Sequence, residues 1–319
     1  MKFNTIGRTC SRSAALALFA VALAPISTNA APGDLFTSGR SGTISQFTPA
    51  GVQTTFASGL SQSLGVAFDT AGDLFEADTA SNTIFKFTPT GVKSTFASGL
   101  NNPIGLAFDT AGNLFVGDEV SNSILKFTAG GVKSTFATGL SFPSGLAFDA
   151  TGNLYEADDK SIFKFTPGGV KSTFASGLGP AFGPTGLAFD SAGNLFATEG
   201  VNNSGTGFEI LKFTPGGVKS TFATGLSDPI GLAFDRAGNL FVADFNFDDI
   251  FKYTPGGTQS VFASGGQQEA LAFQPAPEPT TFTLLGTAIT LLAARRSLRK
   301  RKGGKEKGTF GLCRKPALV

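Results

Sequence analysis

Residues 105–138 read GLAFDTAGNLFVGDEVSNSILKFTAGGVKSTFAT, and this stretch decides the fold because the chain repeats it. Its opening pentapeptide, Gly-Leu/Val-Ala-Phe-Asp, recurs at spacings of 40, 40, 41 and 45 residues, ending at Asp69, Asp109, Asp149, Asp190 and Asp235. A degenerate copy, Glu269–Phe273, ends 39 residues after Phe234. A unit of 40–45 residues that contains several strands is typical of propeller blades.

Each repeat predicts four short strands. The segments GLAF, NLFVGD, SILKF and VKSTFAT are rich in Val, Ile, Leu, Phe and Thr, and Gly, Pro, Asn or Asp separate them. The Ala-Gly-Asn and Gly-Gly turns supply residues that tolerate positive φ in a hairpin. No segment between Ala31 and Glu278 has an apolar period of 3.6 residues. The repeats therefore predict an all-β propeller with four antiparallel strands in each blade.

The number of strands of each type predicts six blades and the way in which the ring closes. The second strand type occurs six times, at 34–38, 73–78, 113–118, 153–158, 194–199 and 239–244. The first type begins only at Leu64 and ends with Glu269–Phe273. The last strand one should therefore pair with the first strands two to four, which removes an open sheet edge. We expect one phenylalanine from each first strand to pack between blades: Phe68, Phe108, Phe148, Phe189, Phe234 and Phe273.

The strings GLAFD, GNLFV and ILKF resemble NHL repeats and, more distantly, gluconolactonase-like and strictosidine-synthase-like six-bladed propellers. The resemblance covers residues 32–276 and implies the fold. It says little about activity, because function in such proteins depends on loops carried by a common scaffold.

Residues 1–31 have the features of a secretory signal peptide. A cationic start is followed by an apolar run from Ala14 to Pro25 and by small residues at Thr28 and Ala30. We expect cleavage after Ala30 or Ala31, and export through the inner membrane. A retained amphipathic helix is the alternative.

Residues 277–302 contain a short membrane segment and a basic end. Pro277, Glu278 and Pro279 precede an apolar stretch of 15 residues, Thr280–Ala294, and the basic cluster Arg295–Lys302 follows. An unaided span needs ~20 residues, and the basic cluster should stay cytoplasmic. Residues 303–319 are expected to form a disordered tail.

The order of Pro-Glu-Pro, short apolar segment and basic end resembles the PEP-CTERM sorting signal. The resemblance implies that an exosortase recognises Pro277, Glu278 and Pro279 and cleaves near them. The destination would be the cell envelope, the cell surface or the extracellular matrix. An ordinary C-terminal anchor is the alternative, and residues 303–319 depart from the usual end of this signal.

Charge and composition exclude several functions. Residues 32–279 carry 22 acids and 12 bases, a net charge of −10, which argues against a nucleic-acid partner. The chain has no His, so a Ser-His-Asp triad and a His-ligated zinc site are excluded. Its two cysteines, Cys10 and Cys313, lie outside the repeats, so the propeller has no disulfides.

The loops between blades carry polar and aromatic residues that do not repeat, and we predict them as ligand-binding candidates near the channel mouth: Gln62, Asn102, Phe142, Asp228, Gln268 and Glu269. Ordinary solvated loop residues are the alternative. Residues 244–249, DFNFDD, add Phe245 and Phe247, which can stack on sugar rings or partner side chains. Packing of this loop on itself is the alternative.

Carboxylates end the second strand in five blades: Asp78, Asp118, Asp158, Glu199 and Asp244. One interpretation is an acidic ring that binds Ca²⁺ or a cationic ligand. The other is that each carboxylate caps its own turn. Their repetition favours the caps. The aspartates beside the Ala-Gly-Asn turns are also expected to stabilise those turns.

We expect a binding or structural module for a protein or polysaccharide ligand, because the blades are nearly identical and no catalytic constellation is evident. The alternative is a metal-dependent lactonase or related hydrolase. The resemblance to gluconolactonases, which bind a metal through Glu, Asn and Asp, offers Glu269, Asn102 and Asp228 as metal ligands, with a divalent cation such as Ca²⁺ as cofactor. An unspecialised repeat spacer is the third possibility.

Overall fold

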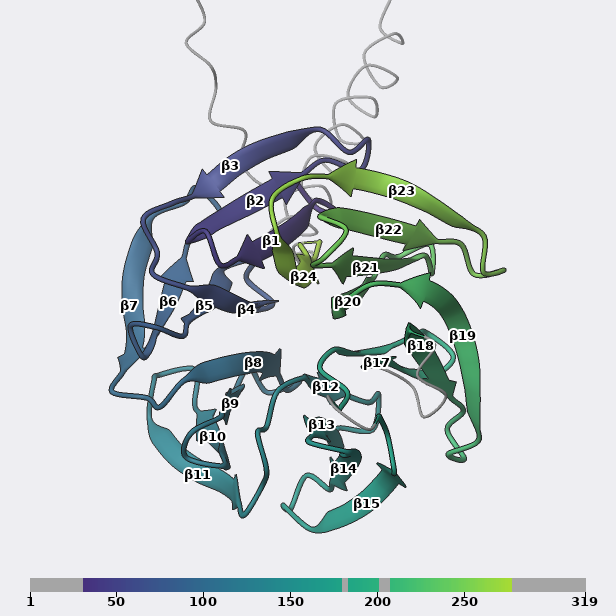
Figure 1. Ribbon diagram of the computed structural model, residues 1–319. Helices are drawn as coiled ribbons and strands as arrows, with labels where there is room; N and C mark the ends of the chain where they lie inside the picture. The colour runs from purple at the N-terminus through teal and green to yellow at the C-terminus, as the bar shows by residue number, and fades with distance from the viewer. Residues whose placement is uncertain (1–30, 180–182, 201–206, 277–319) are drawn as a thin grey trace, which may run out of the picture.

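The computed structural model describes residues 31–179, 183–200 and 207–276, which form six four-stranded antiparallel sheets around a central axis (Figure 1). The prediction of an all-β, six-bladed propeller is therefore confirmed. No helix long and apolar enough to span a membrane is found among these residues. The signal peptide, the Pro277-Glu278-Pro279 motif and the tail lie outside the described residues.

Five blades are continuous in sequence. Blade one contains β4 (Ser63–Phe68), β5 (Leu74–Asp78), β6 (Thr83–Phe87) and β7 (Lys93–Ser98). Blade two contains β8 (Pro103–Phe108), β9 (Leu114–Asp118), β10 (Ser123–Phe127) and β11 (Lys133–Thr138). Blade three contains β12 (Leu146–Phe148), β13 (Leu154–Asp158), β14 (Ser161–Phe165) and β15 (Lys171–Ser176). Blade four contains β16 (Leu187–Phe189), β17 (Leu195–Glu199), β18 (Phe208–Phe213) and β19 (Lys219–Leu226). Blade five contains β20 (Pro229–Phe234), β21 (Leu240–Asp244), β22 (Asp249–Tyr253) and β23 (Gln259–Ser264).

The sixth blade, called the closing blade, joins the two ends of the chain as predicted. It contains β24 (Gln268–Phe273), β1 (Leu35–Gly39), β2 (Thr43–Phe47) and β3 (Gln53–Ala57), in the order β24-β1-β2-β3. Figure 1 shows the yellow-green β24 beside the purple β1. Leu35 pairs with Phe273 and Thr37 with Leu271, and the register shifts after Ser38.

The two chain ends also rebuild a turn. In the regular blades, two backbone hydrogen bonds of 3.0–3.1 Å close the turn between the first and second strands. In the closing blade, the Gln274 N–H donates to the Asp34 carbonyl at 2.9 Å, and the Gly33 N–H donates to the Gln274 carbonyl at 3.1 Å. Gly33 has φ +92°, within the left-handed region that glycine adopts without strain. The same hydrogen-bond pattern therefore forms across a break in the chain.

Aromatic residues pack the blades against one another. The Phe75 ring of β5 lies edge-on to Phe96 of its own blade at 5.0 Å and to Phe108 of the next blade at 4.9 Å between centroids. The same arrangement recurs around Phe36, Phe115, Tyr155, Phe196 and Phe241. Each edge-to-face pair contributes about 0.5–1.5 kcal/mol beyond area burial. All six first-strand phenylalanines thus pack between blades, as expected.

The strand order gives the propeller two rims. The turns between strands one and two, and between strands three and four, lie on one rim, here called the turn rim. The loops after strand two and the loops between blades lie on the other, here called the loop rim. First strands of neighbouring blades contact one another around the axis, so the interblade loops surround the channel mouth.

Candidate functional site

The turn-rim aspartates stabilise their own turns, as expected. The Asp109 Oδ1 accepts the N–H groups of Ala111 at 3.0 Å and Asn113 at 2.8 Å, and its Oδ2 accepts the Asn113 side-chain amide at 2.7 Å. Lys126 lies 3.7 Å from the same carboxylate. Both carboxyl oxygens of Asp109 are therefore engaged in stabilising the hairpin.

The carboxylates at the ends of the second strands anchor the interblade loops. Asp78 accepts the backbone N–H groups of Ser61 at 2.8 Å and Gln62 at 3.1 Å. Asp118, Asp158, Glu199 and Asp244 accept the corresponding groups in their blades, and all five carboxylates are buried. These contacts support a structural role, although the carboxylates cap the incoming loop more than their own turn. Within the described part of the chain, no group of three or more Asp, Glu, His or Cys residues is arranged to hold a metal ion.

A cluster of charged and aromatic side chains lies on the loop rim where the ring closes. The Arg40 Nε donates to the Glu269 carboxylate of β24, and the Arg40 guanidinium lies 4.8 Å from the centre of the Phe245 ring in blade five. The Arg40 side chain is 54% exposed, whereas that of Glu269 is only 4% exposed. Together with Asp228, these residues are called the seam cluster.

Electrostatic interactions link the members of the seam cluster. Burial raises the pKa of the Glu269 carboxyl, Arg40 lowers it and Asp228 raises it. Burial also raises the pKa of the Asp228 carboxyl, Asp244 raises it further and Arg40 lowers it. One exposed guanidinium thus offsets the charge of two partly desolvated carboxylates.

Three of the predicted candidates, Asp228, Phe245 and Glu269, therefore lie together. Arg40 was not predicted. The sequence does carry a signal for Arg40, which is a reversal of charge after the second strand. The other blades have Asp or Glu there, followed by Thr, Glu, Asp, Gly or Phe, and the closing blade has Gly39-Arg40.

The remaining candidates lie elsewhere. Gln268 is buried, and its side-chain oxygen accepts the Thr37 hydroxyl inside the closing blade. Phe247 is 49% exposed and its ring lies 6.1 Å from Phe251. This contact makes the loop partly self-packed, as the alternative reading expected, while one face of the ring stays open to solvent.

The other three belong to blades one, two and three. Gln62 presents its backbone to Asp78 and Thr79, Asn102 donates its side-chain amide to Glu119, and Phe142 is 63% exposed. Blade one separates Asn102 from the closing blade, and no hydrogen bond among the described residues joins it to Asp228 or Glu269 (Figure 1). Two of the three residues suggested as metal ligands thus have separate side-chain partners: Glu119 for Asn102 and Arg40 for Glu269.

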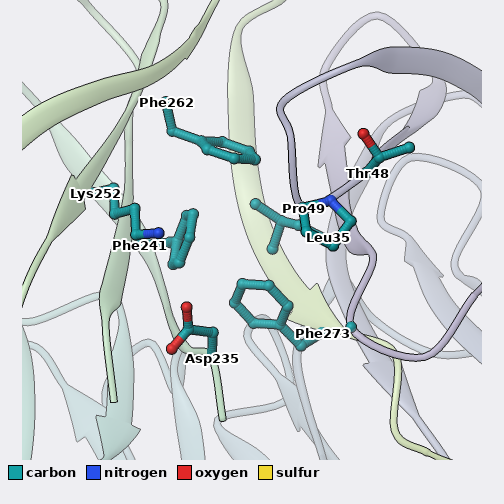
Figure 2. A pocket seen from close by; sticks show the side chains of 9 residues that line it. Leu35, Thr48, Pro49, Asp235, Phe241, Lys252, Phe262 and Phe273 are labelled. Carbon is teal, nitrogen blue, oxygen red and sulfur yellow. The ribbon is translucent and has the colours of Figure 1, made fainter. Parts of the chain in front are cut away.

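A small hollow lies at the opposite, turn-rim end of the same blade interface (Figure 2). Phe241, Phe262, Phe273, Leu35 and Pro49 form its apolar wall, and Asp235 and Lys252 stand at its edge. Its volume of about 80 Å³ is far below the ~300 Å³ at which pockets for organic ligands begin. This hollow is therefore too small to enclose an organic ligand.

No protein-family model matches the chain, and no curated protein matches its sequence. Among solved structures, it is similar to a chain in the crystal structure of a nidogen/laminin complex, with a TM-score of 0.66, 19% identity, and 76% of this chain and 99% of that chain covered. It is also similar to a streptogramin B lyase, with a TM-score of 0.61, 16% identity, and 76% and 87% covered. A gluconolactonase from Xanthomonas campestris gives a TM-score of 0.60, 16% identity, and 78% and 95% covered. At these identities the likeness establishes the fold alone, and the similar structures include a chain from a complex and enzymes.

Proposed function

We propose that the chain is an exported binding module whose loop rim recognises a hydroxyl-rich polymer, a polysaccharide of the cell envelope or matrix. The observation that carries the proposal is the seam cluster. An exposed guanidinium, two carboxylates and an aromatic ring meet there on the loop rim.

The chemistry of the cluster suits a sugar polymer. Guanidinium and carboxylate groups make paired hydrogen bonds to neighbouring hydroxyls, and aromatic rings supply flat contact surface with little loss of side-chain entropy. Phe247 and Phe142 add exposed aromatic surface on the same rim.

The proposed route to the surface follows from the two ends of the chain. Residues 1–31 would direct export, and Pro277, Glu278 and Pro279 would be recognised by an exosortase while residues 280–302 hold the protein in the membrane. The resemblance to NHL and PEP-CTERM sequences supports this route. Nucleic acid is not a proposed partner, because the repeats carry a net charge of −10.

A binding assay with matched variants tests the proposal. The full-length exported protein is incubated with purified envelope polysaccharide fractions and with a glycan array. We expect Arg40→Gln to weaken binding at least tenfold, because one charge-assisted hydrogen-bonding group of the seam cluster is lost. Arg236→Gln is the control, since Arg236 is exposed on the turn rim, and it should bind normally.

The other outcomes separate the alternatives. Capture of one envelope protein but no polysaccharide, abolished by Arg40→Gln, would make the ligand a protein. Absence of binding to any surface polymer or protein would favour the spacer. Polysaccharide binding that Arg40→Gln leaves unchanged would place the ligand away from the seam cluster.

A metal-dependent hydrolase is the second candidate, because the Asp228 carboxylate lies close enough to Glu269 on the loop rim to raise the pKa of that carboxyl. Lactone hydrolysis that requires added Ca²⁺, and that both Glu269→Gln and Asn102→Ala abolish, would establish it. The separate partners of Asn102 and Glu269 are the reason for ranking it second.

A further inference from the structure

The split turn of the closing blade holds a buried carboxylate with two neutral donors. Asp34 is 3% exposed. Its Oδ2 accepts the Ala31 backbone N–H at 3.0 Å and the Gln46 side-chain amide at 2.6 Å. Among the described residues, no Lys or Arg nitrogen lies within 4 Å of it. A buried carboxylate without a cation is costly, because neutral donors only partly replace its hydration.

Blade one has a cation beside the equivalent carboxylate, Asp73, and blades two and three have one beside another carboxylate of the same turn. The lysine of the third strand lies beside the turn carboxylates, with Nζ–Oδ2 distances of 2.7 Å for Lys86–Asp73, 3.7 Å for Lys126–Asp109 and 3.8 Å for Lys164–Asp149. Gln46 occupies the lysine position in the closing blade, where it follows Ile44 and Ser45 as Lys86 follows Ile84 and Phe85. The closing blade has thus lost the ammonium of the repeat but kept a carboxylate, Asp34.

We propose that the Asp34 carboxylate is the binding site for the α-ammonium group of Ala31, which forms when the leader is removed. Hydrolysis of the Ala30–Ala31 peptide bond adds water, leaving a carboxylate on Ala30 and an amine on Ala31. That amine is protonated at neutral pH, since α-amino groups have a pKa of about 7.7–8.0. The nitrogen of Ala31 already lies 3.0 Å from Asp34, so cleavage converts a neutral hydrogen bond into an ion pair without any movement.

The consequence is a ring that closes more firmly after processing. Asp34 belongs to the backbone pairing with Gln274 that joins the two chain ends. In the precursor the carboxylate has neutral partners, and in the processed chain it has a cation, as Asp73 has in Lys86 of blade one. The inference selects cleavage after Ala30 over cleavage after Ala31, and it is independent of the ligand on the loop rim.

Unfolding experiments on the processed full-length chain test the inference. One form begins at Ala31, and the other carries Gly-Ser before Ala31, so that its Ala31 nitrogen remains an amide. In urea at pH 6, we expect the ratio of folded to unfolded protein to be about tenfold higher for the form that begins at Ala31, because only that form gains the ion pair with Asp34. An amine with a raised pKa stabilises the fold fully below about pH 8, its unfolded pKa, and the advantage is lost as pH rises through the folded pKa.

Two substitutions identify the partner. Asp34→Asn should make the two forms equally stable, whereas Asp73→Asn, the equivalent residue of blade one paired with Lys86, should leave the tenfold difference intact. If Asp34→Asn does not fold, the rate at which Ala31 is acetylated replaces it, and the folded native chain should react at least tenfold more slowly than the urea-unfolded chain. Equal stability of the two forms, equal acetylation rates, or an exported protein that begins at Pro32 would each overturn the inference.

Discussion

Glu156 lies in the middle of β13 with both carboxyl oxygens buried and with no hydrogen-bond partner among the described residues. Burial raises its pKa to about 8; Asp158 raises it further and Lys171 lowers it. The equivalent residues in blades two and five are Val116 and Val242. Valine therefore fits the same place in the repeat, and Glu156→Val removes the carboxyl with little change in volume.

The expected gain follows from proton linkage. An unfolded glutamate with a pKa of 4.5 is ionised at pH 7, but the folded chain keeps Glu156 protonated. At roughly 1.4 kcal/mol per pKa unit, holding that proton at pH 7 costs about 3 kcal/mol. The cost is nearly absent below pH 4.5, grows until pH 8 and is constant above it. We expect Glu156→Val to raise the free energy of unfolding by about 3 kcal/mol at pH 7 and by about 1 kcal/mol at pH 5.

Urea unfolding at pH 5, 6, 7 and 8 measures this difference. Asp159→Asn, which removes an exposed carboxylate at the end of the same hairpin, is the control and should show no such trend. The reasoning is refuted if Glu156→Val gains the same stability at pH 5 and pH 7, or loses stability at pH 7. Glu76 in blade one is buried in the same way with a pKa of about 8, so the double variant should gain about twice as much.

Two further substitutions test the contacts around the channel. Gly105→Ala should destabilise the fold by roughly 2–4 kcal/mol in urea unfolding, because a Cβ there would lie 1.8 Å from the Ser144 carbonyl oxygen of the next blade. Gly130→Ala is the control and should be neutral, because its Cβ would meet nothing closer than 3.8 Å. Equal effects of the two substitutions would contradict the close packing of first strands. Asp118→Ala should cost about 1–3 kcal/mol and speed hydrogen exchange at the Asn101 amide, because the Asn101 N–H loses its acceptor. Unchanged exchange would show that Asp118 does not anchor the loop.

Most of the fold could be predicted because each repeat contains the turn residues and apolar strands of one complete blade. The closure was also predictable, since no first strand precedes the second strand that begins at Leu35, whereas Glu269–Phe273 is a first strand with no second strand after it. The rebuilt turn at Gly33 and Gln274 was not, because its two halves are far apart in sequence and each half lacks the other's turn residues.

The site was harder to predict, and the residues show why. Asp228, Phe245 and Glu269 were found as departures from the repeat. Arg40 was not predicted, because it lies in a short loop after Gly39, which replaces the acid of the other blades. Gln268 was expected at the channel mouth, yet it begins β24 beside the register shift after Ser38, which turns its side chain inward. Asn102 occupies the same place in the repeat as Asp228, but rotation around the ring puts equivalent residues in different blades.

The two described ends of the propeller, Ala31 and Ala276, stand beside one another on the turn rim, while Arg40 follows the other end of β1. Five residues of extended strand separate the two rims by roughly 17 Å at ~3.3 Å per residue. An attachment made through either terminus would therefore place the turn rim nearer to the support and Arg40 on the rim farther from it.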